Sequence, residues 1–217
     1  MNFLELFALL ASGAGYTLLV TLACIATAMA SGLAVALLGR MRLGVLDRFL
    51  AAYTYVFRGI PVLVLLFIVF FGLPALGLNV PPLVSMMLSL GLIAGAYLAE
   101  VFRGALAAVD ENEIMAAMAM GMSRRQVLLA IEMPQMLRFS LPGMLNEFTT
   151  VLKYSPFAYT VGIPEIMKQA MALASTTLRG MEIYLAIGLL YFAIYKLMLA
   201  TMRAVERRYS VPGFNRL

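Results

Sequence analysis

Histidine and tryptophan are absent from this sequence of 217 residues, and cysteine occurs once, as Cys24. Without histidine, the commonest metal ligand is missing and no serine–histidine or cysteine–histidine nucleophile can form. A single cysteine excludes a disulfide within the chain. No phosphate-binding loop of the type Gly-x-x-x-x-Gly-Lys-Ser/Thr occurs either. We therefore expect no metal site, no bound cofactor and no ATP hydrolysis on this chain.

Charge is also scarce. Charged residues make up 12% and hydrophobic residues 63% of the chain, and the mean hydropathy is +0.94. This composition predicts an all-α integral membrane protein with a single domain spanning residues 1–217. The net charge of +5 fits the basic cytoplasmic loops of a membrane protein and does not by itself indicate a nucleic-acid partner.

Apolar runs long enough to cross a hydrocarbon core of ~30 Å predict five transmembrane helices. They cover residues 14–38, 49–73, 83–99, 139–160 and 183–201. One side of the membrane then receives Arg40, Arg42, Arg48, Arg103, Arg124, Arg125, Arg138, Arg203, Arg207, Arg208 and Arg216, and the other side only Lys168 and Arg179. The positive-inside rule therefore places the N-terminus outside, and the loop 105–138 and the C-terminus in the cytoplasm.

Small residues recur every four positions in the third predicted span, at Gly91, Gly95 and Ala99. This spacing lets two membrane helices approach closely, so we expect Gly91 and Gly95 to lie at a helix contact. The alternative is a pair of glycines without a special partner.

The segment from Asp110 to Pro134 is too polar for lipid and predicts two short helices. Asp110 can cap the first helix in a reciprocal box with Glu113, and Gly121 can end that helix in a left-handed conformation. A second box joins Ser123 to Gln126. We expect the second helix to stop near Glu132, because Pro134 disfavours a helical residue before it.

Ile114, Met115, Met118 and Met122 fall on one side of the first of these helices. A stripe rich in methionine suits an adaptable groove on a partner protein. The alternative is that the stripe packs on its own chain or on the membrane surface, and the spacing alone leaves both open.

Three ionisable residues lie well inside predicted spans: Arg58, Glu147 and Lys153. Such groups usually face a polar cavity or pair with one another. Arg58 could hold a carboxylate and Glu147 an ammonium, so that together they would bind a zwitterion. The alternatives are a mutual pair of Arg58 with Glu147, and a Lys153 side chain that extends to the membrane interface.

Several motifs carry a resemblance to a known family. The segment contains Met115-Ala116-Ala117, then Gly121, then Ile131-Glu132-Met133-Pro134. This pattern is similar to the signature Glu-Ala-Ala, three residues, Gly, nine residues, Ile-x-Leu-Pro. Further similar motifs are Arg58-Gly59-Ile60-Pro61, Phe71-Gly72-Leu73-Pro74, Ala99-Glu100, Arg103-Gly104, Leu141-Pro142, Asn146-Glu147-Phe148, Leu152-Lys153 and Gly162-x-Pro164-Glu165. The sequence thus resembles the permease subunits of bacterial ABC importers, in the polar amino acid family that includes histidine, glutamine, glutamate and opine systems.

The resemblance implies a type I ABC importer permease fold in the bacterial inner membrane, with transport by alternating access. The implied partners are an ATPase dimer that carries ATP and Mg²⁺, a second permease subunit of the same or a related chain, and a periplasmic binding protein. The residues implied to couple to the ATPase are Glu113, Met115, Ala116, Ala117, Met118, Gly121, Ser123, Ile131 and Pro134. Those implied to bind substrate are Arg58, Ile60, Glu147, Lys153 and Tyr154.

Some positions depart from the family pattern. Ile60 replaces the usual Thr, Leu65 an often-present Gln, and Met115 the usual Glu. Tyr154 stands where the family often has Asp or Thr, which favours a neutral or aromatic-tolerant pocket, or a subunit that is the non-binding half of a heterodimer. The competing classes are an ion-driven secondary transporter or channel without an ATPase, and a membrane scaffold whose buried charges only pair.

Overall fold

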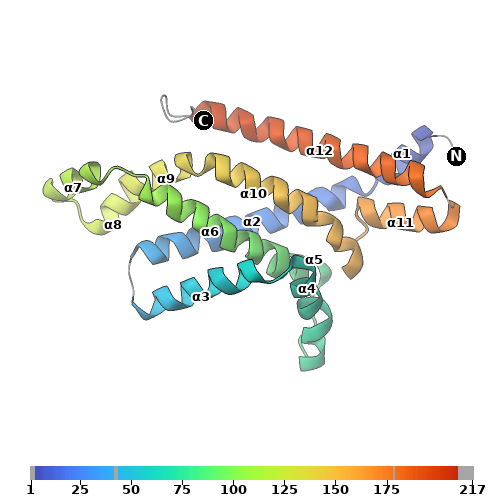
Figure 1. Ribbon diagram of the computed structural model, residues 1–217, viewed down its shortest axis with the longest axis horizontal. Coiled ribbons are helices and arrows are strands. Elements are labelled where there is room, and N and C mark those ends of the chain that lie inside the picture. The colour runs from blue at the N-terminus through green and yellow to red at the C-terminus, as the bar shows by residue number, and fades with distance from the viewer. Residues whose placement is uncertain (1–2, 42–43, 178, 210–217) are drawn as a thin grey trace.

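The computed structural model describes residues 3–41, 44–177 and 179–209, and every regular element in those ranges is helical. Four long helices run roughly side by side (Figure 1): α2 (Ala14–Arg40), α6 (Leu92–Ala107), α10 (Leu141–Tyr154) and α12 (Gly180–Tyr209). The short helices α1 (Phe3–Ala11) and α11 (Ile166–Thr177) lie at one end of this bundle. At the other end lie α7 (Glu111–Ala119) and α8 (Arg124–Val127).

The centre of the bundle is the contact between α2 and the helical run formed by α5 (Pro82–Met86), the π-turn η3 (Met87–Gly91) and α6. The two backbones approach so closely that a Cβ atom on Gly91 would lie 2.8 Å from Cβ of Thr27. A Cβ atom on Gly95 would lie 3.2 Å from the carbonyl oxygen of Ala28 and would overlap the Ser31 hydroxyl. Both glycines therefore lie where a larger residue would push the helices apart.

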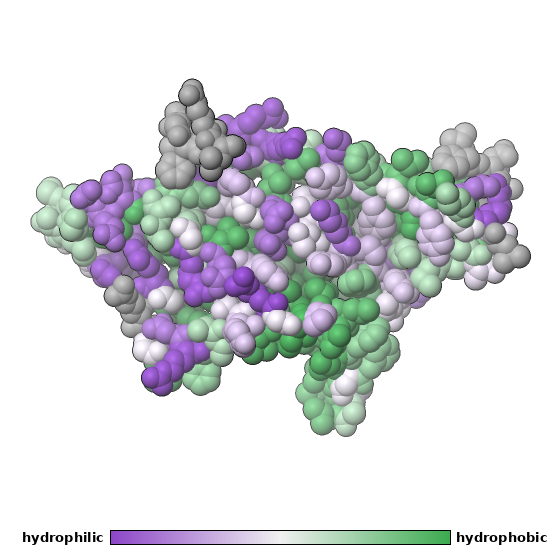
Figure 2. Space-filling view, in the orientation of Figure 1, coloured by the Kyte–Doolittle hydropathy of each residue, from purple (hydrophilic) through white to green (hydrophobic). Residues whose placement is uncertain are grey.

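The second predicted span is sharply bent. It consists of α3 (Val45–Gly59) followed by α4 (Val62–Phe67), the π-turn η1 (Ile68–Gly72) and the 3₁₀ turn η2 (Leu73–Leu76), with an angle of 105° between the two parts. Ile60 is extended, with φ −96° and ψ 129°. The cause is Pro61, which lacks an amide hydrogen and disfavours a helical conformation at the residue before it. The segment of residues 62–81, which we call the arm, projects from the bundle and is hydrophobic over its visible surface (Figures 1 and 2).

Three of the described helical stretches are long and apolar enough to cross a membrane, and the bent pair adds a fourth if it counts as one span. The predicted span 139–160 corresponds to α10 and the 3₁₀ turn η5 (Ser155–Val161), which follow α9 (Met133–Phe139) with only Ser140 between. The amide of Ser140 donates to Met136 and that of Met144 to Ser140, so the helical path is nearly continuous. The count of five spans and their orientation remain predictions, and Arg42 and Arg216 lie outside the described residues.

The caps around α7 and α8 differ in part from the prediction. The Asp110 carboxylate accepts from the amide of Asn112 at 2.8 Å, but the predicted reciprocal bond from Glu113 is wrong. Glu113 instead accepts from the side chain of Gln135 at 2.6 Å. Gly121 has a φ of +89°, and the Ser123 amide donates to the Gln126 side chain at 2.8 Å.

The sequence predicted that the helix after Ser123 stops near Glu132, and this prediction is wrong. The helix passes through a π-turn, η4 (Leu128–Glu132), and continues as α9 to Phe139. Pro134 lacks an amide hydrogen and its ring crowds the carbonyl one turn earlier, and a wider turn just before the proline relieves this conflict. The segment from Asp110 to Pro134 is therefore joined to α10 by helical structure and not by a loop.

Candidate functional site

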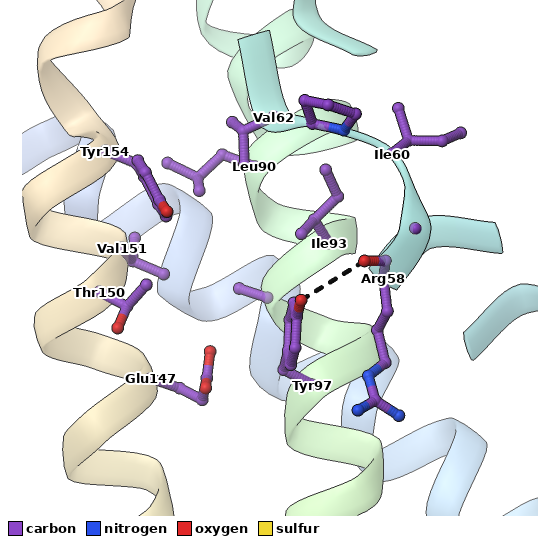
Figure 3. A pocket seen from close by; sticks show the side chains of 13 residues that line it. Arg58, Ile60, Val62, Leu90, Ile93, Tyr97, Glu147, Thr150, Val151 and Tyr154 are labelled. Carbon is purple, nitrogen blue, oxygen red and sulfur yellow. Dashed lines mark hydrogen bonds between the residues drawn. The ribbon is translucent and has the colours of Figure 1, made fainter. Parts of the chain in front are cut away.

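A cavity of about 280 Å³ lies between the bend after α3, the helix α6 and the helix α10 (Figure 3). The break at Ile60 and Pro61 turns backbone and side chains of this bend toward α6 and α10. Four of the five residues expected to bind substrate line this cavity, namely Arg58, Ile60, Glu147 and Tyr154. The fold thus brings together residues that are up to 96 positions apart in the sequence.

Arg58 is held from the α6 side of the cavity. Its guanidinium lies 3.5 Å from the carboxylate of Glu100 and 5.1 Å from the centre of the Tyr97 ring. The Tyr97 hydroxyl donates to the carbonyl oxygen of Arg58 at 3.4 Å. The partly exposed ion pair with Glu100 and the cation–π contact orient the arginine without burying it, so its remaining donors stay accessible.

Glu147 lies across the cavity on α10 (Figure 3) and forms no ion pair or hydrogen bond with any of the described residues. The mutual pair of Arg58 with Glu147, which the sequence left open, is therefore not formed, because Glu100 takes that place on Arg58. Thr150 and Tyr154 follow Glu147 along the same helix and line the same cavity. The cavity thus presents a cation on one wall and an unpaired carboxylate on the other.

Lys153 lies outside this cavity. It points to the other side of α10, where its ammonium lies 5.7 Å from the ring of Tyr195 on α12. It lines a separate and mostly apolar cavity with Pro156 and Phe192. Tyr97, Glu100 and Thr150 also lie at the site, and the sequence did not predict them as site residues. A signal was present for two of them, because Tyr97 and Glu100 are polar residues three positions apart at the end of the predicted span 83–99.

The methionine stripe of α7 divides between two roles. Ile114 and Ala117 are buried against Val109 and Val127, and Met122 packs on the same cluster. The exposed fractions of Met115, Met118 and Met120 are 56%, 38% and 86%. One half of the helix therefore packs on its own chain, while the other half presents methionines at the end of the molecule.

Of the other residues expected to couple to an ATPase, Ala116, Gly121, Ser123, Pro134 and Glu113 are exposed and Ile131 is half-buried. They belong to the surface formed by α7, α8 and the start of α9. In Figure 1, α7 and α8 lie at one end of the bundle, away from the bend between α3 and α4 that lines the cavity.

Apolar helices that enclose a cavity with opposed charges are typical of membrane transport proteins. The family model described as "binding-protein-dependent transport system inner membrane component" matches residues 28–211. The chain is 33% identical over 199 residues to the probable amino-acid permease protein YxeN of Bacillus subtilis, covering 90% of this chain and 89% of that protein. It is 34% identical to the histidine/lysine/arginine/ornithine transport system permease protein HisQ of Escherichia coli, over 73% of this chain and 75% of that one.

Solved structures agree. A crystal structure of an amino acid ABC transporter with histidines superposes with a TM-score of 0.86 and 29% identity, covering 96% of this chain and 99% of that chain. The MetNI methionine ABC transporter in an inward-facing conformation shares the fold, with a TM-score of 0.77 and 22% identity, covering 94% of this chain and 97% of that one.

The chain belongs to the family of binding-protein-dependent transport system inner membrane components. It is a permease subunit of an ABC importer with the type I fold. The subunit is a non-enzymatic component of the transporter, and ATP hydrolysis belongs to a separate ATPase. An importer of this kind works with an ATPase and with a substrate-binding protein. Membership of this family decides against an ion-driven secondary transporter or channel and against a scaffold.

Proposed function

We propose that this subunit imports a polar amino acid and that the cavity between α3, α6 and α10 holds the amino acid during transport. Relatives over most of the chain are named amino-acid permeases, and the structure with the TM-score of 0.86 is an amino acid transporter. The observation that carries the proposal is the placement of Arg58 and Glu147 on opposite walls of one small cavity. An amino acid is a zwitterion of matching charge.

In the proposed complex, Arg58 binds the α-carboxylate and Glu147 the α-ammonium, with Tyr154 and Ile60 beside the side chain of the substrate. Arg58 has five N–H donors, so the contact with Glu100 leaves donors for a second carboxylate. Glu147 has no competing partner among the described residues. We do not include Lys153, because it lies on the opposite side of α10.

The proposal is tested in the complete transporter, reconstituted in vesicles and supplied with saturating loaded binding protein. Arg58→Ala and Glu147→Gln should each lower the rate or affinity of amino acid uptake at least about tenfold, because each removes a charge-assisted contact. Arg103→Ala is the matched control: Arg103 also contacts Glu100 but lines a different cavity. Loss of that exposed pair should change uptake no more than about twofold. Normal uptake by Arg58→Ala would exclude the assignment.

We further propose that the methionine surface of α7 docks in a groove of the ATPase dimer, which binds ATP and Mg²⁺, and that a second permease subunit and a periplasmic binding protein complete the importer in the inner membrane. Met115, Met118 and Met120 have large, flexible side chains and are exposed at one end of the helix bundle, as an adaptable apolar contact requires. The helical path from α8 through α9 to α10 would carry movement of this surface to the wall of the cavity that holds Glu147.

Met118→Asp should uncouple the transporter, because it places a charge in an apolar contact. We expect the ATPase to co-purify more weakly and its hydrolysis to lose stimulation by the loaded binding protein. Met181→Asp is the control, since Met181 is also exposed but lies at the start of α12 near the opposite end. Unchanged co-purification and unchanged stimulation for Met118→Asp would exclude docking through α7. Mass spectrometry of the natively purified complex decides between a homodimer and a heterodimer of permeases.

A further inference from the structure

A cavity of about 590 Å³ lies where the end of α2 meets α8 and η4. We call it the basic groove. Three arginines line it: Arg40 at the end of α2, and Arg124 and Arg125 in α8. It is separate from the amino acid cavity and shares no lining residue with it.

The charges of the basic groove do not cancel. Arg40 forms an ion pair with Glu132, whose side chain is buried, and its Nε also donates to the same carboxylate oxygen at 3.0 Å. This pair fixes one wall of the groove and contributes no net charge. Arg124 and Arg125 form no ion pair with any residue of the described chain. The groove therefore keeps two positive charges without a counterion, which favours an anionic ligand.

The remaining lining is apolar. Leu37 and Met41 come from α2, and Leu128 and Leu129 come from the helix opposite. Met41 and Leu129 are about half exposed, so hydrophobic surface lies open beside the guanidinium groups. A small inorganic anion would use the arginines and leave this apolar surface in water. The ligand that satisfies both parts is an amphiphile, with an anionic head and a hydrocarbon chain.

The position of the groove identifies where such an amphiphile comes from. α2 carries no charged residue from Ala14 to Gly39, so it lies at the depth of the hydrocarbon core, and Arg40 marks its end. The groove thus opens at the level where phospholipid headgroups meet acyl chains. The basic residues of the chain predict that this is the cytoplasmic leaflet, which carries anionic phospholipids.

We propose that the basic groove binds one anionic phospholipid, with its phosphodiester headgroup on Arg124 and Arg125 and the upper part of its acyl chains along Leu37, Leu128 and Leu129. The bound lipid bridges the end of a membrane span and the helix that follows α7. Anionic lipid in the membrane then strengthens the contact between the segment from Asp110 to Pro134 and the bundle.

The test uses the complete transporter, with its ATPase present, in vesicles of phosphatidylcholine that contain a small fraction of phosphatidylglycerol with a photoreactive group near the top of one acyl chain. After irradiation, mass spectrometry maps the adducts. Adducts are expected on the peptides that contain Leu37–Met41 and Leu128–Leu129. Arg124→Gln with Arg125→Gln should lower this labelling roughly 25-fold, which is about fivefold for each arginine removed near a membrane surface. Arg124→Lys with Arg125→Lys should keep most of it.

Arg48→Gln is the matched control, because Arg48 is another exposed arginine at the same end of the bundle but does not line the groove. It should leave labelling of these two peptides unchanged. The experiment is repeated with a phosphatidylcholine that carries the same photoreactive group. Equal labelling by the two lipids, or full labelling of the double glutamine variant, would overturn the proposal. Displacement of the label by inorganic phosphate would show a site for a soluble anion instead. Labelling that occurs only without the ATPase would show that a protein occupies the groove.

Discussion

The contact between α2 and α6 is closed, whereas the arm of residues 62–81 is open. In the contact, Gly32 faces Gly95 across the two helices: a Cβ atom on Gly32 would lie 3.0 Å from the Gly95 carbonyl oxygen and 2.9 Å from Cβ of Leu98. On the arm, Phe71 and Leu76 are 58% and 76% exposed. One chain therefore completes the first region by itself and leaves the second for something else to cover.

The difference follows from what holds helices together in a membrane. Lipid tails are as apolar as leucine, so close packing of small residues, and not hydrophobicity, joins α2 to α6. The arm packs on its own chain through side chains such as Leu66 and Phe70, but it leaves other apolar side chains, such as Phe71 and Leu76, exposed. The arm is thus suited to packing against the second permease subunit that we propose.

The largest effect is expected from opening the closed contact. Gly95→Leu would place a side chain against Ala28 and Tyr53 and should destabilise the fold by about 1–3 kcal/mol or more. The measurement is the yield of monodisperse protein and its melting by circular dichroism. Gly15→Leu is the control, because Gly15 belongs to α2 but has open space around it. Equal stability of the two variants would show that the contact is looser than its distances indicate.

The open region is tested by asking what covers it. A benzophenone side chain in place of Phe71 should crosslink the arm to the other permease subunit in the intact transporter, as read by mass spectrometry. The same substitution at Phe70 is the control, because Phe70 packs against the core of its own chain and should give adducts only within it. If the benzophenone at position 71 crosslinks to lipid and to no protein, the arm faces the bilayer. The exposed side chains of the arm would then not be a contact surface for the second permease subunit.

Short-range patterns predicted part of this architecture. The spacing of Gly91 and Gly95 and the residues Ser123 and Gln126 refer to neighbours within one helix turn or one helix face, and such features can be read from a sequence. The class of fold follows from composition, because only helices or closed barrels satisfy the backbone in lipid.

The sequence could not predict features that depend on how distant segments pack against one another. Arg58 had two carboxylates as potential partners, and the packing of α3 on α6 selects Glu100 over Glu147. Proline gave the same local signal twice with opposite results. At Pro61 the chain bends by 105°, whereas before Pro134 a π-turn keeps the helix going. The proline alone therefore does not predict which outcome occurs.

The smallest effect is expected at Glu165, a buried carboxylate that joins the start of α11 to α12. Glu165 is fully buried and accepts from the amides of Met167 and Lys168 at 2.8 Å and from the Tyr191 hydroxyl at 2.6 Å. Burial raises the pKa of the Glu165 carboxyl above its usual value, and these donors offset part of that rise. A raised pKa means that the contribution of this group to stability is fully present below its unfolded pKa and is lost as pH rises through its folded pKa.

Tyr191→Phe removes one donor and should cost about 1 kcal/mol. It should also raise the pKa of Glu165 further, so the loss of stability with rising pH becomes larger and extends to higher pH. Circular dichroism melting across a pH series measures both effects, and it needs no tryptophan, which this chain lacks. Tyr195→Phe, one turn later on α12, is the control, because the Tyr195 hydroxyl has no hydrogen bond to Glu165. Identical pH profiles for the two variants would show that Tyr191 does not tune this carboxylate and that α11 is held by its backbone contacts alone.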